Sequence, residues 1–258
     1  IYENMKNIAN TIFGIRRWLL KTIIPEFIWP KTVEFDGAEI PVRGMNYTFG
    51  VKWVLTKGVY EDSERILLKK VLKEGDSVLE MGASIGVVTA IIIKLIGTSG
   101  RLISIEASEL LANQTRKWIE LKGNAKIIHG FGFPVDKVPS KYESLNYKFD
   151  GNSLGGYIDF SQESDSKKSD NIFDLSRIEI ENNFKPSSLI LDIEGSEIVV
   201  MEPNVNIPKY IQNIVIEMHP DMYGIETENK IINKFFEFGF IHKMEINHVF
   251  LLSRNEFH

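Results

Sequence analysis

Apolar and polar positions along the chain form short runs that predict alternating strands and helices from residue 62 onward. Seven apolar runs bounded by polar or glycine-containing turns are typical of buried strands: 77–80, 101–106, 125–129, 188–192, 212–217, 240–246 and 248–253. Apolar residues at helical spacing predict helices over 62–72, from 87, over 110–121 and over 227–238. This alternation predicts an α/β fold with a mostly parallel sheet, its last strand antiparallel. Glycine, serine and charged residues dominate 150–170, where we expect an exposed insertion near the rim of the site.

The first 24 residues carry apolar side chains at spacings of three and four, which predicts an amphipathic helix. Its apolar stripe comprises Ile1, Met5, Ile8, Ile12, Ile15 and Leu19. We expect this helix to pack against its own domain or a second copy of the chain, giving a homodimer, with a membrane-surface role as the other interpretation. A β-hairpin over 31–42 follows, because Asp36-Gly37 suits a tight turn between two short strands. Residues 1–57 are therefore expected to be an extension that precedes a domain at 58–258.

A glycine-containing turn joins the strand at 77–80 to the helix that starts at Val87. The turn carries Glu80, Gly82, Ala83, Ser84 and Gly86, an acidic-x-Gly-x-x-x-Gly spacing that differs from the G-x-G-x-x-G of nicotinamide and flavin sites. Glycines in such a turn can also serve packing alone. Glu106, at the end of the next strand, stands where a nucleotide-binding chain places a carboxylate for the ribose hydroxyls. The spacing resembles the S-adenosylmethionine loop of Rossmann-like methyltransferases.

A second motif, Leu191-Asp-Ile-Glu-Gly-Ser-Glu197, places three carboxylates at the end of the fourth strand. Open α/β sheets bind ligands at this edge. Asp192 ends an apolar strand and should be partly buried. Because burial of a carboxylate costs free energy, such a position suggests a functional role. Glu194, Ser196 and Glu197 have an alternative role, since they can cap and favour the start of a following helix. The fifth strand also ends in ionisable groups, Glu217 and His219.

These motifs resemble, in order along the chain, those of the FkbM-type S-adenosylmethionine-dependent methyltransferases. The matching pieces are Gly58-Val-Tyr-Glu61, the turn at 80–86, Ile105-Glu106, 191–197 and Val215-Ile-Glu-Met-His-Pro220. The resemblance implies a Rossmann-like class I fold and an O-methyltransferase acting on a hydroxyl, often of a sugar in a glycan or of a natural product. The chain departs from the family pattern at Glu80, Ser84 and Ala107. On this basis the cofactor-binding residues are expected to be Tyr60, Glu61, Glu80, Gly82, Ala83, Ser84, Gly86, Glu106, Ala107, Gly130, Phe131 and Asp192.

The catalytic residues are expected to be Asp192, Glu194 and His219, which follow neighbouring strands and should project into one cleft. Methyl transfer to an alcohol needs a general base, and histidine titrates nearest to neutral pH. A histidine followed by Pro220 is equally a structural turn residue, so the base is left open among the three. A divalent metal held by Asp192, Glu194, Glu217 and His219 is a further interpretation, because these ligand types suit Mg²⁺ or Mn²⁺, but no spacing rule requires it and we assign no metal.

Composition and net charge exclude several kinds of site and partner. The 258 residues carry a net charge of −5, which gives no electrostatic support for a nucleic-acid partner. The sequence contains no cysteine, which excludes disulfides, thiolate metal sites and a cysteine nucleophile and fits a reducing, cytoplasmic setting. No apolar run approaches the length of a membrane span. Two rival classes stay open: a methyltransferase of another acceptor class, and a non-catalytic glycan-binding or assembly module.

Overall fold

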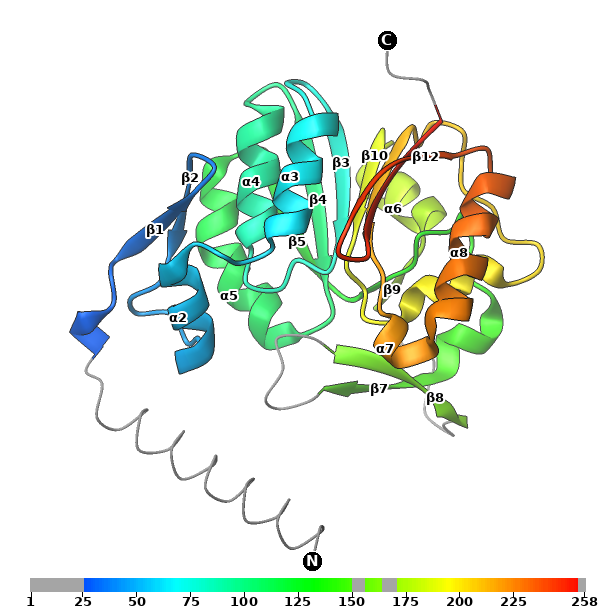
Figure 1. The fold of residues 1–258 in the computed structure, drawn as a ribbon, viewed down its shortest axis with the longest axis horizontal. Helices are drawn as coiled ribbons and strands as arrows, with labels where there is room; N and C mark the ends of the chain where they lie inside the picture. The colour runs from blue at the N-terminus through cyan, green and yellow to red at the C-terminus, as the bar shows by residue number, and fades with distance from the viewer. Residues whose placement is uncertain (1–25, 150–155, 164–170, 255–258) are drawn as a thin grey trace, which may run out of the picture. The chain divides into compact units, whose positions relative to one another are not determined.

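The computed structural model describes residues 26–149, 156–163 and 171–254 (Figure 1). The predicted helix within residues 1–24 and the polar tract 164–170 lie outside these ranges. The chain divides into two compact units, Ile1–Tyr60 and Glu61–His258, and each is described by itself. The boundary that we predicted lay between residues 57 and 58. No helix in the described ranges has the length and hydropathy needed to cross a membrane.

The described part of the first unit contains a β-hairpin and one α-helix. Strand β1 (Thr32–Phe35) pairs antiparallel with β2 (Ala38–Pro41), and helix α2 spans Phe49–Lys57. Asp36 and Gly37 both have positive φ angles, 49° and 80°, as the predicted tight turn requires. The hairpin prediction is therefore confirmed, whereas helix α2 was not predicted.

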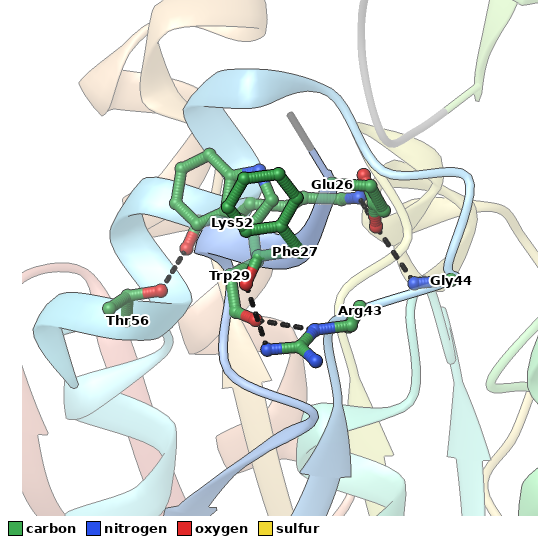
Figure 2. Close-up of polar contacts among 7 residues, drawn as sticks. All are labelled: Glu26, Phe27, Trp29, Arg43, Gly44, Lys52 and Thr56. Atoms are coloured by element: carbon green, nitrogen blue, oxygen red, sulfur yellow. Dashed lines mark hydrogen bonds and ion pairs between the residues drawn. The ribbon is translucent and has the colours of Figure 1, made fainter. Parts of the chain in front are cut away.

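Two charged side chains tie the segment before the hairpin to the rest of this unit (Figure 2). The Arg43 guanidinium donates to the carbonyl oxygens of Trp29 (2.7 Å) and Phe27 (3.0 Å), within and beside the 3₁₀ turn η1 (Glu26–Ile28). The Lys52 ammonium, on α2 and almost fully buried, lies 2.5 Å from a carboxylate oxygen of Glu26. These contacts fix the path of the chain from η1 to α2.

The second unit is built on a seven-stranded sheet with the order β12-β13-β11-β10-β3-β4-β5 (Figure 1). The strands are β3 (Ser77–Met81), β4 (Arg101–Glu106), β5 (Ala125–His129), β10 (Ser188–Leu191), β11 (Asn213–Glu217), β12 (Ile241–Ile246) and β13 (Val249–Ser253). All the neighbouring pairs are parallel except those of β13, which runs antiparallel to both β11 and β12. The Rossmann-like fold with a mostly parallel sheet and an antiparallel last strand is thus confirmed.

Helices cover both faces of the sheet. They are α3 (Asp62–Val71), α4 (Val87–Ile96), α5 (Glu109–Ile119), α6 (Leu175–Asn182), α7 (Pro220–Tyr223) and α8 (Ile225–Glu237), with 3₁₀ turns η2 (Glu120–Lys122), η3 (Ser140–Ser144) and η4 (Ser196–Met201). In Figure 1, α3, α4 and α5 lie on one side of the sheet and α6 and α8 on the other. Helix α6 was not predicted. The segment after the Asp192 motif, which we considered as a helix start, is the 3₁₀ turn η4.

Two small two-stranded sheets lie outside the main sheet. Strand β6 (Phe131–Gly132) pairs parallel with β9 (Ile172–Phe173), and β7 (Leu145–Phe149) pairs antiparallel with β8 (Gly156–Glu163). Strand β8 falls inside the region 150–170, which we expected to be a loop insertion. The structure corrects this expectation for residues 156–163, where backbone pairing with β7 replaces a loop.

The register of the parallel strands brings four chain segments to one edge of the sheet. Met81 is paired with Ile105 in β4 and with Leu191 in β10, and Leu191 is paired with Ile216 in β11. These paired residues are all buried, and the polar residues that follow them come directly after the apolar part of each strand. The glycine turn, Glu106, Asp192 and Glu217 therefore emerge at the carboxyl ends of adjacent strands, where open α/β sheets bind ligands.

Candidate active site

The turn after β3 has the backbone geometry that its sequence predicts. Gly82, Ser84 and Gly86 all have positive φ angles, 98°, 46° and 84°. The N–H groups of Gly82 and Ala83 both donate to the carbonyl oxygen of Ile105, at 2.8 and 3.2 Å. Helix α4 then begins after Gly86 with no side-chain cap on its first N–H groups. The turn is thus anchored to β4 and directs an uncapped helix N-terminus toward the site edge.

Both glycines are required by packing. A Cβ on Gly82 would lie 1.8 Å from the carbonyl oxygen of Asp192, and one on Gly86 would lie 2.7 Å from Thr115 and 2.8 Å from Trp118. The backbone of the turn therefore touches the end of β10 on one side and helix α5 on the other. The glycines by themselves do not indicate a ligand, because the fold alone demands them.

Glu106 joins the end of β4 to this turn. One carboxylate oxygen accepts the Ser84 N–H at 2.7 Å, and the other accepts the Ser108 N–H at 2.7 Å. The side chain is 4% exposed, and burial raises the pKa of Glu106 to about 7. A carboxylate has about four lone-pair positions, so the two backbone bonds leave acceptor capacity for a further donor such as a hydroxyl.

Glu80 is not placed to touch a ligand, which corrects its predicted role as a cofactor-binding residue. Its carboxylate is buried between the sheet and helix α4, 1% exposed, where one oxygen accepts hydrogen bonds from the hydroxyls of Thr89 (2.7 Å) and Ser104 (2.5 Å). Burial raises the pKa of Glu80 to about 7. The residue links β3 to β4 and α4 and so supports the turn from within the fold.

The other residues expected to bind the cofactor differ in their surroundings. A Cβ on Gly130 would lie 2.4 Å from the Phe173 ring, so β9 explains that glycine, and the partly buried Phe131 packs against the hydrophobic core. Ala107 follows Glu106 at the same edge and is partly exposed. Tyr60 is the last residue of the first unit, and its role as a cofactor-binding residue stays a prediction.

His219 lies at the centre of a cluster of carboxylates that follow β10. Its Nε2 is 3.3 Å from Oδ1 of Asp192 and 3.7 Å from Oε2 of Glu194, while its Nδ1 is 3.2 Å from Oε1 of Glu197. The backbone N–H of His219 donates to the Tyr223 hydroxyl at 2.8 Å, which fixes the residue at the start of α7. The structure thus brings together the three predicted catalytic residues, Asp192, Glu194 and His219.

Glu197 belongs to this cluster, whereas the sequence left open whether it caps a helix or joins the other carboxylates of the motif. It is the second residue of η4, and its side chain is fully buried. One of its oxygens faces the His219 ring, and the other, Oε2, has no hydrogen-bond partner among the described residues. The sequence signal was its position in the motif, three residues after Glu194. A 3₁₀ turn in place of an α-helix directs it inward.

The carboxylates determine the charge of the His219 ring. Burial by itself lowers the pKa of His219, but the carboxylates of Asp192 and Glu197 outweigh burial and hold that pKa well above its usual range. Without another cation nearby the ring is therefore an imidazolium at neutral pH, and it is a poor general base. Burial, with the nearby Asp192 charge, raises the pKa of Glu194.

Glu217 joins a second acidic group and not the first. Its carboxylate meets those of Glu61 and Glu64, with all three ligand atoms within 4.8 Å of one another. Burial, together with a hydrogen bond to Glu64, raises the pKa of Glu217 to about 10, so the two carboxyl groups share a proton. This corrects the four-ligand metal interpretation, since Glu217 is grouped apart from Asp192, Glu194 and His219.

The central part of the second unit is similar to known methyltransferases. The family model described as Protein-L-isoaspartate(D-aspartate) O-methyltransferase (PCMT) matches residues 64–133, which include the glycine turn and Glu106. A probable cobalt-precorrin-6B C(15)-methyltransferase (decarboxylating) of Saccharolobus solfataricus is 31% identical over 97 residues, covering 37% of this chain and 47% of that protein. The chain therefore spans about half the length of this curated relative.

Solved methyltransferase structures show weaker likeness. Fibrillarin of Aeropyrum pernix, in complex with natively bound S-adenosyl-L-methionine, is 14% identical with a TM-score of 0.41, covering 79% of this chain and 73% of its own. Precorrin-6y C5,15-methyltransferase from Geobacter metallireducens GS-15 is 11% identical with a TM-score of 0.42, covering 74% of this chain and 85% of its own. Structural similarity at this level does not by itself assign a fold. The Rossmann-like assignment therefore rests on the strand order of the sheet.

These comparisons confirm the prediction of a methyltransferase domain and agree with S-adenosylmethionine as its cofactor, but the resemblance to the FkbM family is wrong. The matching model is PCMT, and the matching relative is a cobalt-precorrin methyltransferase. The error has a plain cause. The glycine turn and Glu106 are shared by many methyltransferases, and the Asp-x-Glu-Gly-x-Glu motif that suggested FkbM lies outside residues 64–133.

Proposed function

We propose that this protein is an S-adenosylmethionine-dependent methyltransferase that transfers a methyl group to an oxygen atom of its acceptor. The observation that carries the proposal is the contact between the Glu106 carboxylate and the Ser84 N–H, which places a strand-end carboxylate beside the turn and the uncapped start of α4. The bound cofactor would supply an electrophilic methyl group on a sulfonium.

The residues present fit this cofactor. Glu106 keeps acceptor capacity for ribose hydroxyls after its two backbone bonds. Asp192 lies against the turn through Gly82, and its buried Oδ1 has no hydrogen-bond partner among the described residues. A negative group at this point suits the positive charge of the sulfonium and the ammonium of the cofactor. The turn, Glu106 and Asp192 would hold the cofactor.

The charge of the site favours a neutral hydroxyl as acceptor. Asp192, Glu194 and Glu197 lie around a single imidazole, so the cluster keeps a net negative charge even when the ring is protonated. A carboxylate acceptor or a nucleic-acid phosphate would be repelled here, because like charges close together cost free energy. A sugar hydroxyl satisfies this condition. The FkbM resemblance, which had also suggested a sugar acceptor, no longer supports it.

His219 does not serve as the general base in this proposal. Each of its ring nitrogens faces a carboxylate, so the ring is held in place and is not free to take a proton from the acceptor. Asp192 and Glu194 are more exposed, with side chains 30% and 41% accessible. They are the groups of the cluster that can contact an acceptor and orient its hydroxyl.

The test has a binding part and an acceptor part. We expect calorimetry to show S-adenosylmethionine binding, weakened at least tenfold by Glu106→Ala and unchanged by Glu109→Ala, which removes an exposed carboxylate nearby. Affinity within twofold of the parent for Glu106→Ala would reject the cofactor site. A screen with radiolabelled methyl donor should label sugars or other hydroxyl compounds; labelling of carboxyl-bearing peptides or RNA alone would contradict the proposed acceptor.

A further inference from the structure

Three side-chain atoms in the carboxylate cluster, one each from Asp192, Glu194 and His219, lie close enough together to bind one ion. His219 Nε2 is 3.3 Å from Asp192 Oδ1 and 3.7 Å from Glu194 Oε2, and all three ligand atoms lie within 4.8 Å. Oδ1 of Asp192 is buried and has no hydrogen-bond partner in the described part of the chain. Two ligands bound about 2.1 Å from one ion are at most about 4.2 Å apart, so both distances to His219 fit a shared cation.

We propose that Asp192, Glu194 and His219 bind one divalent metal ion. The three come from the ends of two adjacent strands, β10 and β11, whose register is fixed by parallel pairing. Asp192 directly follows β10, while Glu194 lies two residues further along the chain and His219 lies two residues after β11. The ion would lie beside the glycine turn, because the backbone of Asp192 touches Gly82.

Glu197 supplies a second, independent observation. Its side chain is fully buried and its Oε1 faces Nδ1 of His219 at 3.2 Å, while its Oε2 has no hydrogen-bond partner among the described residues. A carboxylate that accepts the Nδ1 proton leaves Nε2 as the free ligand atom and fixes the ring orientation. Metal-bound histidines are commonly held in this way by a carboxylate behind the ring.

The charge balance points to a cation of more than one unit. Within the described residues, the ion pairs made by Asp192, Glu194 and Glu197 are all with His219. Three carboxylates on one imidazole leave an excess of negative charge that a divalent ion would neutralise. One nitrogen and two carboxylate oxygens suit Mn²⁺ better than Mg²⁺, which prefers oxygen ligands throughout.

Three protein ligands leave coordination positions for water or for an acceptor oxygen. If the proposed function holds, an acceptor hydroxyl bound to the ion would be more acidic, which would reduce the need for a separate base. Metal binding itself does not depend on that function, so it is tested without turnover.

The experiment measures Mn²⁺ binding to the full chain by the loss of the free-ion electron paramagnetic resonance signal. We expect one Mn²⁺ per chain, with affinity reduced at least tenfold in Asp192→Asn, Glu194→Gln and His219→Gln. Glu197→Gln, which changes only the group behind the ring, should weaken binding by about 10- to 100-fold. Circular dichroism verifies the fold of each variant, and Glu194→Gln, at the most exposed position, is the least disruptive of them.

A matched control comes from the other histidine–glutamate pair of this unit. His248 Nδ1 lies 2.9 Å from the buried Glu228 carboxylate, but His248 belongs to no candidate metal group of the described residues. His248→Gln should keep full Mn²⁺ affinity. The proposal is overturned if the parent protein binds no Mn²⁺, if His248→Gln loses binding equally, or if the cluster variants keep it.

A last experiment tests whether the cluster binds a metal ion or the positively charged groups of the cofactor. Mn²⁺ titrations with saturating S-adenosylmethionine should give the parent stoichiometry. Complete loss of Mn²⁺ binding under these conditions would assign the cluster to the positive charges of the cofactor and would overturn the metal proposal. Cofactor binding measured without metal tests the proposed function separately.

Discussion

The carbonyl oxygen of Asp192 lies 1.8 Å from the position that a Cβ would occupy on Gly82, so the glycine turn and the end of β10 are in direct backbone contact. The contact joins the turn expected to hold the cofactor to Asp192, the first carboxylate of the cluster around His219. A change on one side must therefore move the other.

Gly82→Ala is expected to be far more destabilising than an alanine at a comparable glycine. The new methyl group would clash with backbone, and the φ of 98° adds strain. Gly123 has a similar φ of 90° and nothing within 4 Å of its Cβ position, so Gly123→Ala should cost only about 1–2 kcal/mol. Urea unfolding of the two variants checks this, and equal losses would show that strain alone, without the Asp192 contact, sets the cost.

Stability should fall as pH rises through 7, partly because of Glu80. Its folded-state pKa of about 7, against an ordinary value of 4.5, is set by burial of the carboxylate. Below pH 4.5 the group is protonated in both states, and above pH 7 it must carry a buried charge. The maximum loss is on the order of 3 kcal/mol. Glu80→Gln keeps the size of the side chain and removes the charge.

Thermal unfolding between pH 5 and 9 measures this effect. The melting temperature of Glu80→Gln should fall less steeply with pH than that of the parent, but not become flat, because burial shifts the pKa of Glu106 in the same direction. Parallel pH curves for parent and variant would show that Glu80 stays ionised in the folded protein.

Asp192→Asn is expected to reduce methyl transfer by orders of magnitude with little loss of stability. The substitution keeps the shape of the side chain and removes the charge placed beside the turn. Asp221→Asn, which changes an exposed carboxylate on α7, is the control and should leave both quantities near the parent values. Near-parental turnover of Asp192→Asn on a verified acceptor would make the cluster structural.

In the first unit, Arg43→Lys should behave like Arg43→Ala and not like the parent. The guanidinium donates to two carbonyl oxygens, of Phe27 and Trp29, through two different nitrogens, and an ammonium cannot reproduce this fork. Hydrogen exchange of residues 26–30 should quicken in both variants. Protection retained in Arg43→Lys would mean that charge alone holds the turn.

Most of the main sheet could be predicted from sequence because its signals are local. Apolar runs such as 188–192 end in polar residues, and Asn247 marks the last turn, so all seven strands were found close to their observed bounds. Helix α6 was missed because its exposed Ile180 weakens the amphipathic pattern. Strand β8 was missed because it is stabilised by pairing with β7, and a polar, glycine-containing stretch gives no local signal of that pairing.

The site was predicted less completely, for a related reason. Spacing along the chain identified Asp192, Glu194 and His219, but not which carboxylates meet. Whether Glu197 caps a helix or faces His219 depends on η4 being a 3₁₀ turn, and the grouping of Glu217 depends on Glu64 of helix α3. Glu80 was assigned to the ligand because its position in the motif does not reveal that its side chain is buried against helix α4.

Strand β13 also constrains how the protein can be made. It is the last of the sheet strands in the sequence, yet it lies between β11 and β12. As the chain leaves the ribosome, β12 emerges before its only neighbour in the sheet, and β11 keeps an open edge until Val249–Ser253 has been synthesised. Nascent chains that stall before residue 249 would expose these edges to pairing with other chains, so the interval before β13 is synthesised is a period of aggregation risk.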